Sequence, residues 1–115
     1  MAIYNLEERT LDFAKRVRNF VKQTPKNVIT IEDTKQLIRS SGSVGANYIE
    51  ANEAVSKKDF AFRIKIARKE AKESRYWLNL IDDNSSLELN NERLALIDEA
   101  TQLLKIFSSI LVKST

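Results

Sequence analysis

The scarcity of residues that interrupt helices constrains this chain more than any other feature of its sequence. Only two glycines and one proline occur in 115 residues. The backbone therefore has few places to turn, and long helices are the natural outcome. A chain of this length is long enough to bury a core of its own, and we expect a single domain over residues 1–115.

Four segments carry a helix start signal followed by apolar residues at helical spacing. In the first segment Asn5 and Glu8 have the spacing of a capping box, and Pro25 closes the pattern. The later helices are expected to start at Thr30, at Ser56 and near Asn90 or Asn91. The run 82–86 is the clearest loop. We therefore predict an all-α protein, an antiparallel up-down four-helix bundle with short connections.

Small residues in the second and third helices predict close helix packing. The third helix carries a regular core seam with steps of four and three residues: Phe60, Ile64, Ala67, Ala71, Ser74, Leu78 and Ile81. The second helix contains Gly42 and Gly45, and a glycine inside a helix costs about 1 kcal/mol relative to alanine. We interpret both glycines as points of backbone contact with another helix. The alternative is that they open space for a ligand.

The net charge of +3 is unevenly distributed. Residues 56–81 hold eight basic and three acidic residues, whereas residues 82–115 hold three and six. At about 100° per residue, one flank of the third helix carries Lys58, Lys65, Arg68, Lys69 and Lys72. Lys15, Arg18 and Lys22 share one side of the first helix. These cations predict a phosphate-binding surface for RNA or DNA, with a solvated helix face as the alternative. Tyr76 is the one aromatic residue expected among them, so base stacking is not expected.

Two helices carry more apolar surface than one bundle face needs. The surplus residues are Phe62, Ile66, Trp77 and Leu80 in the third helix, and Leu96, Leu103, Ile106 and Ile110 in the fourth. A large exposed apolar patch is typical of a protein interface, and Trp and Phe are enriched in interface cores. We therefore predict a homo-oligomer. The alternative is that one of these flanks completes a broad core face.

Composition argues against an enzyme. The chain has no cysteine and no histidine, so thiol chemistry, imidazole acid–base catalysis and most transition-metal sites are excluded. Glu50, Glu53 and Asp59 are the acidic candidates, but a carboxylate metal site in a bundle normally includes a histidine. We expect no catalytic residues, no metal and no cofactor. No apolar run is long enough to span a membrane and the start does not resemble a secretion signal, so a cytoplasmic location is expected.

The run SSGSVGANYIEA at 40–51, followed by SKKDF at 56–60 and IKIARKEAKE at 64–73, resembles the bacterial four-helix-bundle proteins known as 23S ribosomal RNA intervening-sequence proteins. The resemblance implies an up-down bundle that commonly assembles into a ring-like homopentamer. It also extends to the accessory protein of diversity-generating retroelements, which works with nucleic acid and a reverse transcriptase. The helix-packing signature then consists of Ser41, Gly42, Gly45, Ala46 and Asn47.

These observations predict a non-enzymatic, homo-oligomeric bundle that binds nucleic acid non-specifically through the basic face of its third helix. The alternative is a protein–protein interaction scaffold without direct contact to nucleic acid. The expected partners are further copies of the chain, RNA or DNA, and a reverse transcriptase or another protein.

Overall fold

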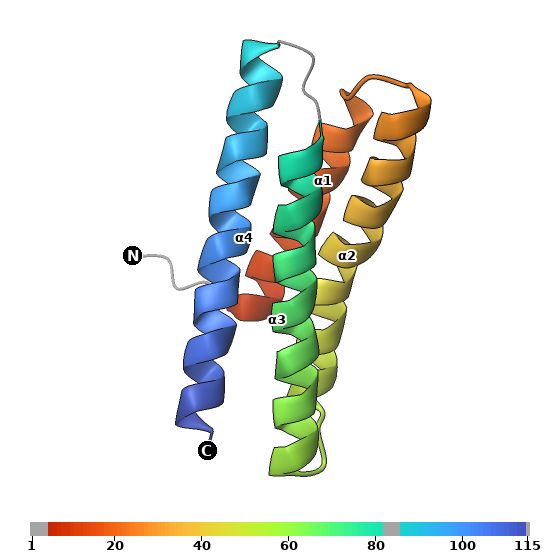
Figure 1. The fold of residues 1–115 in the computed structure, drawn as a ribbon. Coiled ribbons are helices and arrows are strands. Elements are labelled where there is room, and N and C mark those ends of the chain that lie inside the picture. The colour runs from red at the N-terminus through yellow and green to blue at the C-terminus, as the bar shows by residue number, and fades with distance from the viewer. Residues whose placement is uncertain (1–4, 82–85, 115) are drawn as a thin grey trace.

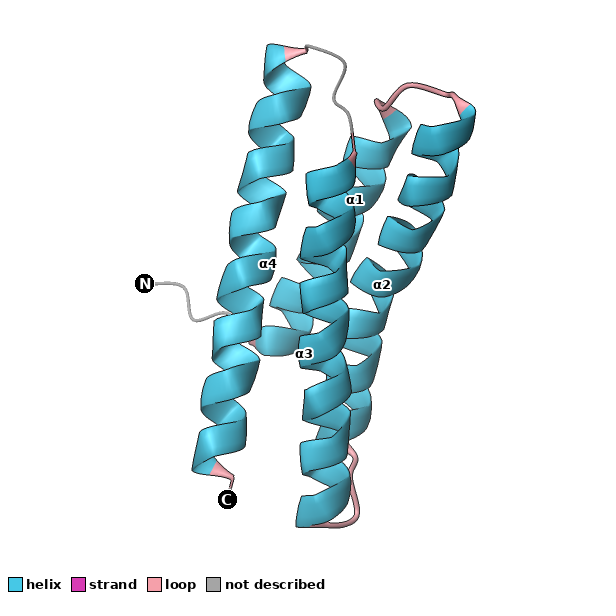
Figure 2. Ribbon diagram, in the orientation of Figure 1, coloured by secondary structure: helices cyan, strands magenta, loops and turns pink. Residues whose placement is uncertain are grey.

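The computed structural model describes residues 5–81 and 86–114, and this part of the chain consists of four helices joined by short connections (Figures 1 and 2). The helices are α1 (Leu6–Lys22), α2 (Val28–Asn52), α3 (Lys57–Leu80) and α4 (Leu87–Lys113). The described residues contain no strand. The predicted all-α four-helix bundle is therefore confirmed.

Side-chain caps explain where the helices begin. The Asn5 side chain accepts a hydrogen bond from the Glu8 backbone N–H at 3.0 Å, and Ser56 accepts one from the Asp59 N–H at 3.0 Å. Each cap satisfies a backbone donor that has no partner inside the helix. Both predicted starts are confirmed, with Ser56 as the cap and Asp59 in the first turn of α3.

The other two predicted helix starts are wrong by about one turn. Asn27 caps α2, where its side chain accepts from the Thr30 N–H at 2.9 Å. Ser86 caps α4 and accepts from the Leu89 N–H at 3.2 Å. In each case a capping residue stands three positions before the donor, which is the usual N-cap geometry. Of the predicted loop, residues 82–85 lie outside the described residues.

Neighbouring helices in the chain are neighbours in space. α2 packs against α1 and α3, and α4 packs against α3 and α1 (Figure 1). The Arg9 Nε lies 2.8 Å from Glu99 Oε2 between α1 and α4, and the two Oγ atoms of Ser40 and Ser74 lie 2.9 Å apart between α2 and α3. Within the described residues α1 and α3 make no close backbone contact. They occupy opposite corners of an antiparallel bundle.

The hydrophobic core lies between the four helices, and each of them contributes side chains to it. The largest fully buried side chains are Phe13, Phe20, Phe107, Leu37, Ile64, Leu78, Leu96 and Leu103. The predicted seam of α3 is confirmed, because Ile64, Ala67, Ala71, Ser74, Leu78 and Ile81 are buried and Phe60 packs against them. These residues repeat with the period of one helix face, so a single side of α3 is removed from water.

Gly45 lets α1 approach α2 closely. A β-carbon built on this glycine would come 2.8 Å from the Thr10 Oγ1 and 3.1 Å from the Thr10 Cβ. The predicted role of Gly45 in a helix contact is therefore confirmed, and the partner is α1. Gly42 is less crowded, because its β-carbon would meet only the Nη2 of Arg18, at 3.6 Å.

Candidate nucleic-acid interface

Four of the predicted cations line one groove between α3 and α4. The groove has a volume of about 400 Å³, and its lining consists of Lys65, Arg68, Lys69, Lys72, Leu104 and Ser108. Lysines and arginines at intervals of three and four residues share one side of a helix. The sequence thus brings four positive charges together within about two turns of α3. We call this site the α3–α4 basic groove.

Contacts with α4 fix the wall of the groove. The Nη1 of Arg68 donates to the Ser108 Oγ at 3.5 Å, and the Nη1 of Arg75 donates to the Thr101 Oγ1 at 3.3 Å. Both acceptors are neutral hydroxyls, so neither contact places a negative charge beside the guanidinium groups. Arg75 therefore adds a fifth cation at the contact between α3 and α4.

The groove cations are not neutralised by neighbouring acids. No acidic residue belongs to the described lining. Within residues 5–81 and 86–114, Lys65, Arg68, Lys69 and Lys72 form no ion pair. Lysine and arginine without a carboxylate partner are available to phosphate groups, whose contacts release counterions.

An arginine of α2 forms ion pairs with the two glutamates Glu70 and Glu73 on one flank of α3. The Nη1 of Arg39 lies 3.3 Å from Glu70 Oε1, and its Nη2 lies 2.8 Å from Glu73 Oε1. Glu70 is only 7% exposed, and a buried carboxylate needs such a partner to offset its lost hydration. The separation of charge on α3 therefore has a structural cause: Glu70 and Glu73 pair with α2, whereas the groove cations face α4 and solvent.

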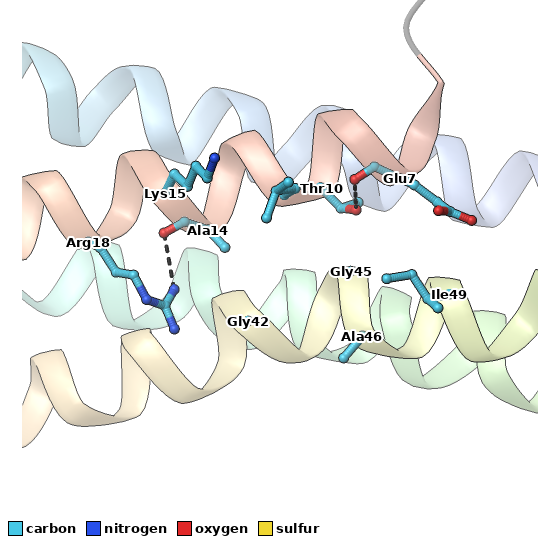
Figure 3. A pocket seen from close by; sticks show the side chains of 10 residues that line it. Glu7, Thr10, Ala14, Lys15, Arg18, Gly42, Gly45, Ala46 and Ile49 are labelled. Carbon is cyan, nitrogen blue, oxygen red and sulfur yellow. Dashed lines mark hydrogen bonds between the residues drawn. The ribbon is translucent and has the colours of Figure 1, made fainter.

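Two of the three predicted cations of α1 lie in a different groove. Lys15 and Arg18 line a groove of about 490 Å³ between α1 and α2, together with Gly42, Gly45 and Ile49 (Figure 3). Arg18 donates there to the Ala14 carbonyl at 3.1 Å (Figure 3).

The pairs α1–α2 and α3–α4 form opposite sides of the bundle, so Lys15 and Arg18 do not extend the α3–α4 basic groove. Lys22 is exposed in the last turn of α1, and Lys58 is exposed in the first turn of α3.

The signature residues of α2 are divided between the core and the α1–α2 groove. Ser41 is buried and its Oγ donates to the Ile38 carbonyl at 3.2 Å. Ala46 is exposed in the groove. Asn47 is half-buried, donates to the Ser43 carbonyl at 2.9 Å and accepts from Arg63 of α3 at 3.3 Å. Asn47 thus links α2 to α3.

The predicted oligomer interface requires a correction in α4. Leu96 and Leu103 are fully buried within the single chain and belong to the core. They share a helix face with Ala100 and Phe107, whereas Leu94 is 50% exposed. The prediction is wrong because apolar residues cover more than half of this helix, so the pattern does not define which side faces inward.

The other predicted interface residues remain at or near the surface. Phe62 and Leu80 are exposed, while Ile66, Trp77, Ile106 and Ile110 are half-buried. Trp77 packs against the core. Within the described residues its indole Nε1 is buried and has no hydrogen-bond acceptor.

The acidic residues considered for catalysis do not form a site. Glu50 and Glu53 are exposed at the end of α2, and Asp59 lies in the first turn of α3. The described residues contain no group of three acidic, histidine or cysteine side chains that is suited to a metal ion. None of the described helices is long and apolar enough to cross a membrane.

Comparison with known proteins identifies relatives over nearly the whole chain. The family model "23S rRNA-intervening sequence protein" matches residues 4–109. A solved structure, a protein with unknown function from the S23 ribosomal protein family of Bacteroides thetaiotaomicron, is 32% identical and superposes with a TM-score of 0.80. The match covers 93% of this chain and 98% of that one. No curated protein matches the chain.

Proposed function

The chain belongs to the family of 23S rRNA-intervening sequence proteins, and we propose that within this fold the α3–α4 basic groove binds the phosphate backbone of nucleic acid without sequence specificity. The supporting observation is the set of four cations in one groove, none of which is paired with a carboxylate in the described part of the chain. Contacts to phosphate carry no sequence information, so the expected binding is non-specific. We also propose that the protein is not an enzyme.

The dependence of affinity on salt tests the electrostatic mechanism. Each phosphate neutralised on duplex DNA contributes a slope of about −0.9 to the plot of log affinity against log salt concentration. Contact with all four groove cations predicts a slope of about −3 to −4. Fluorescence anisotropy with a labelled duplex between about 50 and 200 mM salt would measure it. Affinity that does not change over this range would contradict the proposal.

Charge reversal tests the location of the site. The variant K65E/K69E/K72E should lose at least about 100-fold in affinity, because three phosphate contacts become repulsions. The matched control K15E/R18E/K22E changes net charge by the same amount, but on the opposite side of the bundle. It should lose less than about threefold at moderate salt, where exposed charges are screened beyond about 10 Å. Equal losses would indicate general attraction to a cationic protein.

Self-association is a second proposal, and the exposed apolar side chains of α3 support it. Phe62 and Leu80 are each about half exposed, and exposed apolar clusters are typical of interfaces. The homopentamer implied by the family resemblance stays a prediction. Static light scattering would decide, since a single species at the monomer mass of 13.2 kDa would contradict self-association.

A further inference from the structure

The outward side of α3 carries a second regular stripe, opposite the core seam. It consists of Lys58, Phe62, Lys65, Lys69, Lys72 and Tyr76, with alternating steps of four and three residues. At about 100° per residue these six side chains fall within one arc of about 80°. We call them the outer stripe. It shares three lysines with the α3–α4 basic groove, and an aromatic residue lies beyond them in each direction.

Both aromatic side chains of the outer stripe are accessible. Phe62 is 56% exposed and Tyr76 is 58% exposed. Tyr76 is held from one side by Trp77, whose ring lies edge-on with the centroids 5.2 Å apart. The Arg63 guanidinium carbon lies 5.8 Å from the centroid of the Phe62 ring, which places a further cation at that end of the stripe. The two rings are partly immobilised and still largely exposed to solvent.

The carboxylate next to the outer stripe is already paired. Glu73 lies at the edge of the arc, and the Nη2 of Arg39 holds it at 2.8 Å. Glu70, one turn earlier, is buried against the same arginine. A polyanion that lies along Lys65, Lys69 and Lys72 therefore meets them beside carboxylates that are already paired, and Asp59 lies on this edge only in the first turn of α3.

We propose that the outer stripe binds single-stranded nucleic acid in preference to duplex, with bases stacked on Phe62 and Tyr76 and phosphates on the lysines between them. This inference rests on the proposed function. Aromatic rings combined with a track of cations are the usual means of binding single strands, because every unpaired base offers a π-face. Paired bases in a duplex are covered by their neighbours, so a duplex gains only the charge contacts.

The length of the stripe sets the size of the ligand. Phe62 and Tyr76 are fourteen positions apart, which is about 21 Å along the helix axis. At about 3.4 Å per stacked nucleotide, a strand of about six nucleotides reaches both rings.

Fluorescence anisotropy with two probes tests the inference. The first probe is an oligothymidylate of about twelve nucleotides, twice the span of the stripe, and the second is a duplex of the same length. The wild-type chain should bind the single strand at least about tenfold more tightly at the same salt concentration. Tyr76→Ala should lose about tenfold toward the single strand and leave the duplex affinity unchanged. Tyr76→Phe keeps the ring and should bind like the wild type.

The outcomes separate this inference from the function on which it rests. Equal affinity for both probes, with binding still abolished by K65E/K69E/K72E, would overturn the single-strand preference and leave the proposed function in place. No binding to either probe would overturn both.

Phe62 needs a separate control because it also belongs to the predicted oligomer interface. Phe62→Ala should weaken single-strand binding about tenfold when it is compared with the wild type at a protein concentration where both have the same mass by light scattering. A change in mass with unaltered affinity would assign Phe62 to a subunit contact and overturn its stacking role. Far-UV circular dichroism would verify that each variant is folded.

Discussion

Gly45 of α2 and Thr10 of α1 touch so closely that no β-carbon fits at the glycine, since the added atom would lie 2.8 Å from the threonine Oγ1. Thr10 is itself buried, and its hydroxyl donates to the Leu6 carbonyl at 2.9 Å. The threonine side chain is short and stiff at χ1. It has little freedom to move away from an added atom.

We therefore expect Gly45→Ala to destabilise the bundle, although alanine favours helices. The overpacking penalty of about 1–3 kcal/mol exceeds the propensity gain of about 1 kcal/mol. Gly42→Ala is the matched control, because its β-carbon meets only the flexible end of Arg18, at 3.6 Å. It should leave the free energy of unfolding unchanged or raise it by up to about 1 kcal/mol. Urea denaturation would measure both variants.

A double-mutant cycle with Thr10→Ala would identify the cause of the loss. Removing the Oγ1 takes away the nearest atom, so the double variant should recover at least about 0.5 kcal/mol relative to additive single changes. Strict additivity would mean that the contact with Thr10 is not what excludes a side chain at position 45.

Arg39 should matter more for stability than an exposed arginine normally does. Arg39→Met keeps the apolar stem but leaves the buried Glu70 without its partner. The expected cost is about 1–3 kcal/mol in the free energy of unfolding. Glu73→Gln removes only the more exposed of the two pairs and should cost less than about 1 kcal/mol. Thermal denaturation of both variants under one buffer condition would show the ranking, and equal costs would contradict it.

Leu96 and Ile106 should respond differently to truncation. Leu96→Ala opens a cavity in the core and should cost about 2–5 kcal/mol. Ile106 is half-buried on the surface, so Ile106→Ala should cost less, and any change in its light-scattering mass would place it in a subunit contact. A small cost at Leu96 would contradict its position in the core.

Asn27 provides a test of where α2 begins. Asn27→Ala removes the acceptor for the Thr30 N–H and should cost about 1 kcal/mol. Asn27→Asp keeps an acceptor oxygen at the same place and adds charge at the positive end of the helix dipole, so it should be neutral or stabilising. If alanine and aspartate gave the same unfolding free energy, Asn27 would not be the cap.

Local signals in the sequence were sufficient for the presence of four helices, but not for the starts of α2 and α4 or for the rotation of α4. The Asn5 and Ser56 caps were readable because each precedes an acidic residue by three positions and opens an apolar pattern. In α4 the apolar residues surround most of the helix, so periodicity placed Leu96 and Leu103 outward, the reverse of the structure. In the structure, Glu92 and Glu99 lie on the side of α4 that faces α1, where they pair with Arg16 and Arg9, respectively.

For the candidate site, too, the sequence predicted local features but not the arrangement of the helices. The lysines of α3 were recognised as one flank from their spacing alone. That Lys15 and Arg18 lie in another groove depends on which helices are neighbours, which local spacing does not contain. The pairing of Arg39 with Glu70 joins residues 31 positions apart in the sequence. Phe62 was assigned to an apolar flank, although its spacing also aligns it with the lysines, and the structure added that its ring is exposed beside them.

The Arg39 contacts have a consequence for how the molecule meets a charged partner. Two carboxylates of α3 are turned toward α2 and neutralised there. Within the described residues, the lysines on the other flank of the same helix form no ion pair. The charge of the bundle is therefore distributed asymmetrically across its width, and the net charge of +3 does not reveal this asymmetry. A polyanion approaching from any direction exerts a torque on such a molecule and turns it, so that the encounter begins with α3 facing the partner.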